Sequence, residues 1–297
     1  MSSRLWDAVI IGGGPAGLAA GMYLARAGYS TKMVEKDRPG WQARHLGRIE
    51  NYPGFPRGIT GRGLMDRCLR QALRWGMGLC RGEALAVERH AGRFRTRLRD
   101  GGGLESRAVI ICTGASFKKL GVPGESGLYG RGIWHAPFAR ARSFSGQSVA
   151  VVGGGETAVH QAIELARHAR RVYLLTRQPW LKAHPLLKRR LAENHNVAHW
   201  PGVSIERLAR EKSALRLRLL RETQARRETL SVDALFVLVG QSPEPLKIKG
   251  KGPGLFTAGD GSGQRFRQVA VAGGDGIRAA MECVNYLDIK AAEHASD

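Results

Sequence analysis

The stretch Asp7-Ala-Val-Ile-Ile-Gly-Gly-Gly-Pro-Ala-Gly-Leu18 decides the fold. Its first half is a short apolar run typical of a buried strand, and glycines 12, 14 and 17 follow in the spacing G-x-G-x-x-G. A helical stretch (18–27) and a second strand (31–34) come next, and Glu35 closes the unit 21 residues after Gly14. The glycines permit a tight turn, close approach of the backbone to a pyrophosphate and close helix packing, while the carboxylate accepts from ribose hydroxyls. The stretch therefore predicts a dinucleotide-binding strand–helix–strand unit.

The pattern returns between residues 148 and 177. Ser148-Val-Ala-Val-Val152 precedes Gly153-Gly-Gly-Glu-Thr-Ala158, and a helix through Ala166 and a strand at 172–175 follow. This unit ends in Arg177 instead of an acid, as recognition of a 2′-phosphate requires, and Lys182 can assist. NADPH is therefore expected in preference to NADH, although Arg177 can also be a plain surface arginine. The residues expected at this site are Gly153, Gly155, Glu156, Thr157, Ala158, Arg177 and Lys182.

Two such units in one chain usually bind FAD first and a nicotinamide dinucleotide second, so that hydride can pass from the nicotinamide to the flavin. The chain has 297 residues, enough for two domains of ordinary size, and 43% of them are hydrophobic, enough for a full core. Residues 8–25 carry no charge, but their glycines suit a strand and turn better than a signal peptide or membrane span. A soluble, cytoplasmic protein is expected.

The chain is strongly basic, with 47 Lys and Arg against 25 Asp and Glu and a formal net charge of +22. In residues 93–99 arginine alternates with mostly apolar residues, the pattern of a strand with one solvated face. A solvated surface therefore explains much of the charge. The sequence has no recognisable nucleic-acid module, so nucleic acid is not expected. An acidic redox protein is the specific partner that the charge favours.

The cysteines indicate a reducing compartment. Cys68, Cys80, Cys112 and Cys283 are widely scattered, and none forms a C-x-x-C pair. This spacing speaks against a zinc ribbon or a disulfide scaffold, and no metal site is expected.

Around the two fingerprints the sequence resembles low-molecular-weight thioredoxin reductase from end to end. The matching stretches, in the order of the family, are residues 10–18, Pro39-Gly-Trp-Gln42, Glu50-Asn-Tyr-Pro-Gly-Phe-Pro56, 108–115, Leu120-Gly-Val-Pro-Gly-Glu125, Gly254-Leu-Phe-Thr-Ala-Gly-Asp260 and Phe266-Arg-Gln-Val269. The resemblance implies an α/β fold with two Rossmann-like, three-layer ββα domains. It places an FAD domain at 1–117 and 243–297, with an NAD(P)H domain at 118–242 inserted between its halves, and it implies a homodimer.

The resemblance also implies roles for residues along the FAD. Asp260 should hold the ribityl chain, and Arg267 and Gln268 should start a helix whose N-terminus faces the flavin N1–O2 edge and stabilises the anionic reduced ring. Gln42 and Asn51 should lie along the cofactor, unless they make only loop hydrogen bonds. The full set expected at FAD is Gly12, Gly14, Pro15, Ala16, Gly17, Glu35, Gln42, Asn51, Thr113, Gly114, Gly259, Asp260, Arg267, Gln268 and Val269.

One departure from the family concerns the chemistry directly. Thioredoxin reductases carry a C-x-x-C dithiol in the nicotinamide domain, and gap-free alignment from Gly132 to Gly146 places its two cysteines at Ala136 and Ala139. Arg140 follows where the family usually has an acidic group or a histidine. A thiolate is the nucleophile in thiol–disulfide exchange, and a methyl group cannot replace it. Either the pair was lost naturally, or both cysteines of a dithiol oxidase or disulfide reductase were deliberately changed to alanine.

The leading interpretation is an NAD(P)H-dependent flavoprotein oxidoreductase that passes electrons from FAD directly to its acceptor. The acceptor could be a ferredoxin or flavodoxin, a quinone, another small molecule or oxygen, although residues 288–297 lack the aromatic tail usual in the family's ferredoxin reductases. Trp134 and His135 are candidates to shape the approach of the acceptor, unless His135 is a loop histidine without chemistry. A non-catalytic redox sensor that binds both nucleotides is the alternative from another class.

Overall fold

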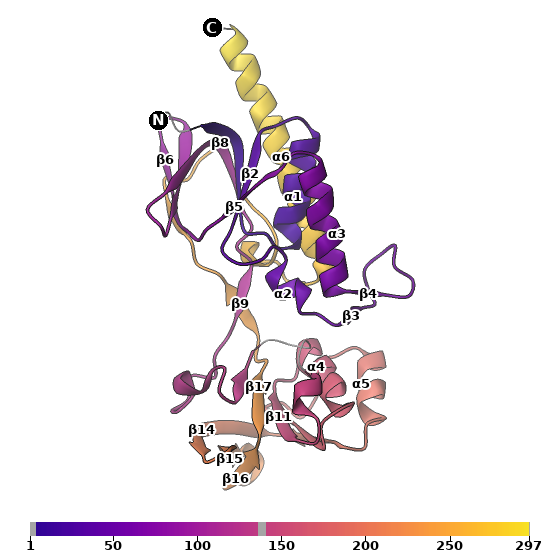
Figure 1. The fold of residues 1–297 in the computed structure, drawn as a ribbon. Coiled ribbons are helices and arrows are strands. Elements are labelled where there is room, and N and C mark those ends of the chain that lie inside the picture. The colour runs from indigo at the N-terminus through magenta and orange to yellow at the C-terminus, as the bar shows by residue number, and fades with distance from the viewer. Residues whose placement is uncertain (1–3, 136–140, 297) are drawn as a thin grey trace. The chain divides into compact units, whose positions relative to one another are not determined.

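The computed structural model describes residues 4–135 and 141–296, which form two compact units. Unit 1 comprises Met1–Ser116 and Pro243–Asp297, and unit 2 is the intervening Phe117–Ser242. The chain passes between the units through β9 (Ala115–Phe117) and β18 (Gln241–Pro243), which pair as a two-stranded sheet. Figure 1 labels many of the elements of both units.

Unit 1 is built on a parallel sheet with an antiparallel extension. The parallel strands are, in spatial order, β5 (Gly78–Arg81), β2 (Thr31–Glu35), β1 (Leu5–Ile11), β8 (Gly103–Ile111) and β20 (Leu255–Thr257). The first half of β8 pairs antiparallel with β7 (Arg93–Leu98), which pairs with β6 (Ala84–His90), and β19 (Lys247–Lys249) lies parallel to β6. A strand pair β3 (Arg48–Ile49) and β4 (Ile59–Thr60), the short α2 (Trp41–Arg44) and η4 (Asp260–Ser262) complete the loops.

Alternation along the parallel strands creates two separate cores in unit 1. Ala8 and Ile10 of β1 pack with α1 (Pro15–Arg26), α3 (Gly61–Arg74) and α6 (Val269–Ser296). Val9 and Ile11 point the other way and pack with Phe94 and other residues of β6 and β7. Because successive side chains of a strand alternate in direction, the uncharged stretch Ala8–Ile11 of β1 can fill both cores. The result is the three-layer ββα arrangement, with the helices gathered on one face (Figure 1).

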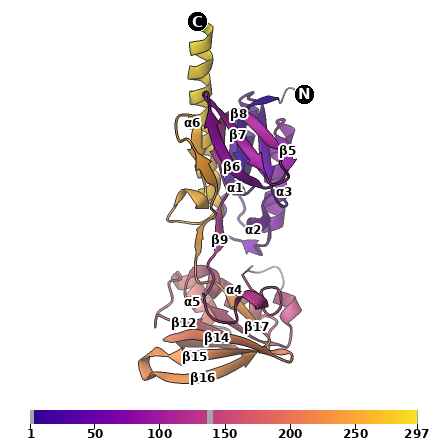
Figure 2. The same cartoon turned by 90° about the vertical axis from the view of Figure 1, so that its left-hand side faces the viewer.

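Unit 2 repeats this plan. Its parallel sheet runs β10 (Ile133–Trp134), β17 (Ala234–Val237), β11 (Ser148–Val152), β12 (Arg171–Thr176) and β13 (Val197–Pro201). One face carries α4 (Glu156–Ala166) and α5 (Pro185–Ala192), and the other carries the antiparallel sheet of β14 (Val203–Glu211), β15 (Ala214–Arg221) and β16 (Arg226–Val232), visible in Figure 2. Three short 3-10 segments lie at Ser126–Leu128, Ala141–Phe144 and Glu222–Gln224. The expected fold, two Rossmann-like ββα domains with one inserted in the other, is confirmed.

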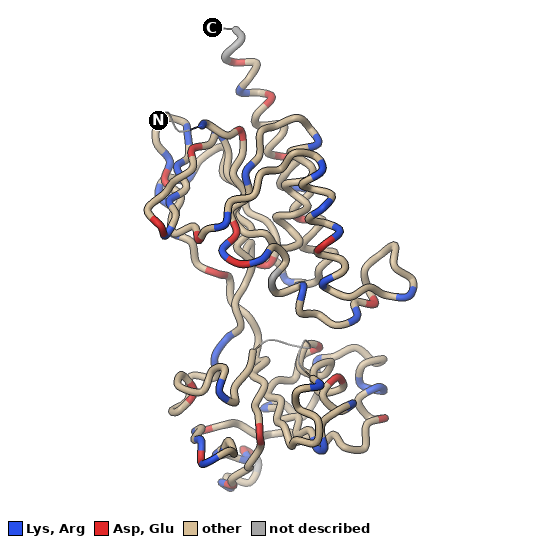
Figure 3. The backbone as a smooth tube through the Cα atoms, viewed as in Figure 1, with Lys and Arg blue, Asp and Glu red and all other residues tan. Residues whose placement is uncertain are grey.

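Basic residues lie along the backbones of both units (Figure 3). In β7 the arginines 93, 95 and 97 are exposed while Phe94, Thr96 and Leu98 are buried, as the alternation predicts. Several arginines pair with acids, for example Arg227 with Glu206 at 3.0 Å. Within residues 4–135 and 141–296, no helix is both long and apolar enough to cross a membrane.

Close backbone packing between α1 and α6 generates the first prediction. A Cβ added at Gly276 of α6 would lie 2.1 Å from the carbonyl oxygen of Ala16, whereas no described atom lies within 4 Å of one added at Gly274. We expect Gly276→Ala to lower the free energy of unfolding by about 1–3 kcal/mol, because backbone atoms must move to make room. Gly274→Ala, on the same helix, should be neutral or stabilise by up to about 1 kcal/mol.

Urea unfolding of the two variants, followed by circular dichroism, checks this prediction. Equal midpoints for Gly276→Ala and Gly274→Ala would contradict the close contact between the helices.

Candidate nucleotide sites

The first glycine loop lies between β1 and α1 and is shaped by backbone contacts. Gly12 has φ +105°, and an added Cβ would lie 2.2 Å from the carbonyl oxygen of Cys112. At Gly17 an added Cβ would lie 1.9 Å from the carbonyl oxygen of Gly12, so neither position has room for a side chain. Around Gly14, by contrast, no described atom lies within 4 Å of the Cβ position. The loop is therefore closed toward the protein and open at its middle glycine.

The open side of this loop is the N-terminus of α1. Gly14 is the N-cap residue and Pro15 occupies the first turn, and no described side chain hydrogen-bonds to the free amides there. Uncapped amides and the helix dipole together favour an anion such as a pyrophosphate. Gly14, Pro15, Ala16 and Gly17 are thus placed where the sequence predicted them.

Glu35, at the end of β2, is bonded to the same loop. Its Oε2 accepts from the Gly13 amide at 2.6 Å, and its Oε1 accepts from the Asp37 amide at 2.8 Å. A carboxylate has about four lone-pair positions, so acceptor capacity remains for ribose hydroxyls. The position of Glu35 beside the glycine loop fits the adenosine ribose of a dinucleotide.

Two further loops meet the start of α1. A Cβ added at Gly259 (φ +77°) would lie 2.9 Å from the Cβ of Ala16, and one added at Gly261 would lie 2.9 Å from the carbonyl oxygen of Gly114. Thr113 in turn donates through its hydroxyl to the carbonyl of Glu244 at 3.3 Å. The structure therefore brings together three predicted segments that are about a hundred residues apart or more: the glycine loop, Thr113–Gly114 and Gly259–Asp260. Partial burial raises the pKa of Asp260, against the opposing effect of Arg267.

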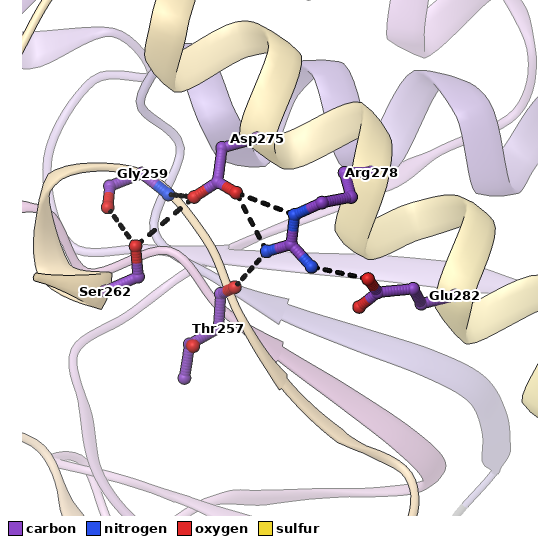
Figure 4. A network of polar contacts seen from close by, with 6 residues as sticks. All are labelled: Thr257, Gly259, Ser262, Asp275, Arg278 and Glu282. Carbon is purple, nitrogen blue, oxygen red and sulfur yellow. Dashed lines mark hydrogen bonds and ion pairs between the residues drawn. The ribbon is translucent and has the colours of Figure 1, made fainter. Parts of the chain in front are cut away.

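Asp275 of α6, which the sequence reasoning missed, holds the 259–262 loop (Figure 4). Its Oδ2 accepts from the Gly259 amide at 2.7 Å and the Ser262 hydroxyl at 3.2 Å, while Oδ1 accepts from Arg278 at 2.8 and 3.0 Å. Burial by itself would raise the pKa of Asp275, but the hydrogen bonds from Arg278 and Gly259 outweigh it and lower the pKa. Arg278 also contacts Glu282 and the carbonyl of Thr257. The network fixes the residues on both sides of Asp260.

The remaining predicted FAD residues lie in two places. Gln42 donates to the carbonyl of Ala115 at 2.6 Å. Asn51 donates through its side-chain amide to Gln268 Oε1 at 3.0 Å, and the Gln268 carbonyl accepts from the Ala272 amide in the first turn of α6. Arg267, Gln268 and Val269 therefore lie at the N-terminus of α6, as the resemblance implied. Gln42 and Asn51 thus both make loop hydrogen bonds, and their contact with FAD stays a prediction.

Taken together, these residues fit FAD. The chain offers an uncapped helix N-terminus for the pyrophosphate, a carboxylate for ribose, a partly buried aspartate for the ribityl chain and a second helix N-terminus at α6. A bound pyrophosphate requires open space at the glycine loop, and the space around Gly14 is open among the described atoms. Among the described residues, no three His, Cys, Asp or Glu side chains gather as a metal site would need.

The second glycine loop, between β11 and α4, has the same form. Gly153 has φ +140°, and an added Cβ would lie 2.2 Å from the carbonyl oxygen of Leu238, while the space around Gly155 is open among the described atoms. Gly155 is the N-cap of α4, and no described side chain caps that helix. Glu156 and Thr157 are exposed in the first turn, and Ala158, fully buried, occupies the position of the third glycine. This loop is likewise suited to a pyrophosphate.

The segment after β12 returns to this loop. Thr176 donates to the carbonyl of Gln178 at 2.8 Å, and its hydroxyl oxygen lies 2.9 Å from His199 Nε2, which must then be the donor. Burial lowers the pKa of His199 and so favours the neutral ring. At the other end of the segment, the Lys182 amide donates to the carbonyl of Gly154 at 2.7 Å. Arg177 and Lys182 are both exposed on this segment, and their contact with a 2′-phosphate stays a prediction.

His135 is held firmly within unit 2. Its Nδ1 lies 3.0 Å from the carbonyl of Val237, so Nδ1 carries the proton, and within the described residues the buried Nε2 has no hydrogen-bond partner. The ring stacks on Tyr129 (centroids 4.6 Å apart) and is parallel to Phe117. Tyr129 in turn bonds to the buried Glu125, which also accepts from the Leu120 and Gly121 amides. Ala136 and Ala139 lie outside the described residues.

The four cysteines all belong to unit 1 and are free. Cys112 and Cys283 are buried, whereas Cys68 and Cys80 are partly exposed. Burial raises the pKa of Cys68 and of Cys112, and it raises that of Cys283 to about 12. These three thiols are therefore held in the protonated, unreactive form at neutral pH.

Comparisons with known proteins agree with this geometry. Residues 6–276 match the model of the pyridine nucleotide-disulphide oxidoreductase family. The chain is 31% identical over 304 residues to a thioredoxin reductase of Bacillus subtilis, covering 96% of each protein. It is 34% identical over 310 residues to NADPH-dependent thioredoxin reductase 3 of Arabidopsis thaliana, covering 95% of this chain and 58% of that protein.

Among solved structures, Lactococcus lactis thioredoxin reductase superimposes with a TM-score of 0.90 at 27% identity, covering 95% of this chain and 99% of that one. The chain therefore belongs to the pyridine nucleotide-disulphide oxidoreductase family, as a thioredoxin reductase-like, NAD(P)H-dependent flavoprotein oxidoreductase with FAD and NADPH as its cofactors.

Proposed function

We propose that this flavoprotein passes electrons from NADPH through FAD directly to an acceptor that needs no dithiol relay. The observation that carries the proposal is the sequence at the positions of the family's C-x-x-C dithiol, where Ala136 and Ala139 stand in place of the two cysteines. Bound FAD supplies a two-electron carrier that accepts hydride from NADPH and needs no protein thiol to be reduced. The four cysteines elsewhere are no substitute, because none of them forms a C-x-x-C pair, and burial raises the pKa of Cys68, Cys112 and Cys283.

FAD binding is assigned to unit 1. The uncapped N-terminus of α1 would bind the pyrophosphate, Glu35 the adenosine ribose and Asp260 the ribityl chain. The N-terminus of α6, at Gln268 and Val269, would stabilise negative charge on the reduced ring. Asp275 acts through the loop that it holds, and it is a positioning residue for Asp260.

NADPH binding is assigned to unit 2. The N-terminus of α4 at Gly155 would bind the pyrophosphate, and Arg177 with Lys182 would bind the 2′-phosphate. The Thr176 hydroxyl accepts from His199 and donates to the carbonyl of Gln178, and it so holds the backbone on either side of Arg177. His135, whose ring is fixed by the Val237 carbonyl and by stacking on Tyr129, would shape the approach of an acceptor.

The electron acceptor is assigned by charge. A formal net charge of +22 favours an acidic redox protein, because opposite charge speeds encounter. A quinone, another small molecule and oxygen are the other acceptors to screen. A homodimer remains the expected assembly.

The nucleotide assignment predicts the effect of reversing one charge. Arg177→Glu should weaken NADPH binding by about tenfold or more, because a charge-assisted contact to the 2′-phosphate is lost and an acid replaces it, while NADH binding should change little. Arg171→Glu, at the other end of β12, makes the same charge change away from the glycine loop. Binding constants for both nucleotides measured by titration check the assignment. A uniform loss for both nucleotides, or an equal effect of Arg171→Glu, would refute it.

The positioning role of Asp275 predicts its effect on FAD. Asp275→Asn should raise the FAD dissociation constant by about tenfold, because Arg278 loses its buried charged partner and the 259–262 loop is released. Glu282→Gln removes the exposed partner of the same arginine and should leave FAD retention unchanged. Flavin fluorescence on dilution measures both. The role would be wrong if the two variants released FAD alike.

The missing dithiol predicts that NADPH reduces the flavin but that the protein does not reduce disulfides. NADPH should bleach the flavin under argon, whereas NADPH-dependent reduction of thioredoxin or an aromatic disulfide should not exceed the uncatalysed rate. Ala136→Cys with Ala139→Cys then tests the history of the site. Recovery of disulfide or dithiol turnover indicates a recent or deliberate loss, and idle thiols indicate a site adapted to another acceptor. Disulfide turnover by the unaltered protein would rule out the proposed route.

A further inference from the structure

We propose that the indole of Trp180 stacks on the adenine ring of the bound nicotinamide dinucleotide. This inference rests on the proposed binding of NADPH at the second glycine loop. Its starting observation is exposure, since the side chain of Trp180 is 58% exposed while most large apolar side chains of the described part of unit 2 lie in its two cores. Aromatic side chains are common in the lining of ligand sites.

The backbone places Trp180 beside the glycine loop. Its carbonyl oxygen lies 3.8 Å from the position of a Cβ added at Gly154, and two residues later the Lys182 amide donates to the Gly154 carbonyl at 2.7 Å. Gly155 and Lys182 also form an isolated parallel bridge. The segment is fixed at its start by the Thr176 hydroxyl, which donates to the carbonyl of Gln178. Trp180 is therefore carried on a short loop anchored on both sides.

The chemistry of this loop matches an adenosine 2′-phosphate. Within six residues it presents a guanidinium at Arg177, an indole at Trp180 and an ammonium at Lys182, all three exposed. The two cations suit the phosphate, and the indole suits the flat base. Adenine is bonded to the same ribose that carries the 2′-phosphate, so a base held at Trp180 lies one sugar ring from the group that Arg177 would bind. Trp180 thus adds a binding contact that does not depend on the phosphate.

The experiment is a titration of the FAD-loaded protein with 2′,5′-ADP, which carries the adenine and the 2′-phosphate but no nicotinamide and so leaves the flavin oxidised. Tryptophan emission and calorimetry follow binding in the unaltered protein, Trp180→Phe, Trp180→Leu and the control Trp75→Leu. Trp75 is 46% exposed and lies in unit 1 next to Arg26. It therefore matches Trp180 in residue type and approximately in exposure, and it belongs to the other unit.

We expect binding to quench part of the tryptophan emission in the unaltered protein and in Trp75→Leu, with equal affinity. Trp180→Phe should bind within about threefold of the unaltered protein, because an aromatic face remains, but without that quenching. Trp180→Leu should bind about tenfold more weakly, as expected for the loss of one base-stacking contact.

Unchanged affinity in Trp180→Leu would overturn the proposal, and so would quenching that persists in Trp180→Phe. Failure of 2′,5′-ADP to bind the unaltered protein would overturn it together with the nucleotide assignment. These measurements do not involve an electron acceptor. A loss confined to the Trp180 variants therefore supports the stacking contact whichever acceptor the enzyme uses.

Discussion

Close packing of backbone on backbone around residues 12–17 is the constraint on which unit 1 depends. Gly12 lies against the carbonyl of Cys112, Gly17 lies against the carbonyl of Gly12, and Gly276 of α6 lies against Ala16, each without room for a Cβ. These contacts bring α1 and α6 together over β1 and leave the α1 amides facing outward. The same glycines that allow dense packing therefore leave an anion site open at Gly14.

Unit 2 meets the same constraint with a different residue. Gly153 lies against the carbonyl of Leu238, but Ala158 replaces the third glycine, and its methyl group lies 3.2 Å from the Cβ position of Gly153. The chemical difference between the two sites then arises at the end of the next strand. Glu35 hydrogen-bonds to its own glycine loop. Arg177, in contrast, is exposed just after the end of β12, on a segment held by hydrogen bonds from Thr176 and Lys182. The two units thus share a backbone plan and differ in the charge of the residue at the end of this strand, Glu35 in unit 1 and Arg177 in unit 2.

The sequence predicted best what is local. The strand, glycine loop, helix and Glu35 all lie between Leu5 and Glu35, and the alternation that fills two cores is visible in β1 itself. The loop-holding role of Asp275 could not be predicted, because its partners Gly259 and Ser262 lie in a separate loop. An aspartate among small residues of a helix is ordinarily expected at the surface. The donation from His199 to Thr176 was missed for a similar reason, since it joins neighbouring strands 23 residues apart. The roles of Gln42 and Asn51 stay predictions, as does the effect of alanine at 136 and 139.

The central claim is that the flavin is the only two-electron carrier in the chain. Stepwise anaerobic titration of the air-oxidised protein with dithionite, followed at the flavin band and with thiols counted after unfolding, tests it most directly. The account predicts full bleaching after two electrons per FAD and four thiols both before and after reduction. Uptake of four electrons per FAD, with two thiols appearing on reduction, would reveal a dithiol couple and contradict it.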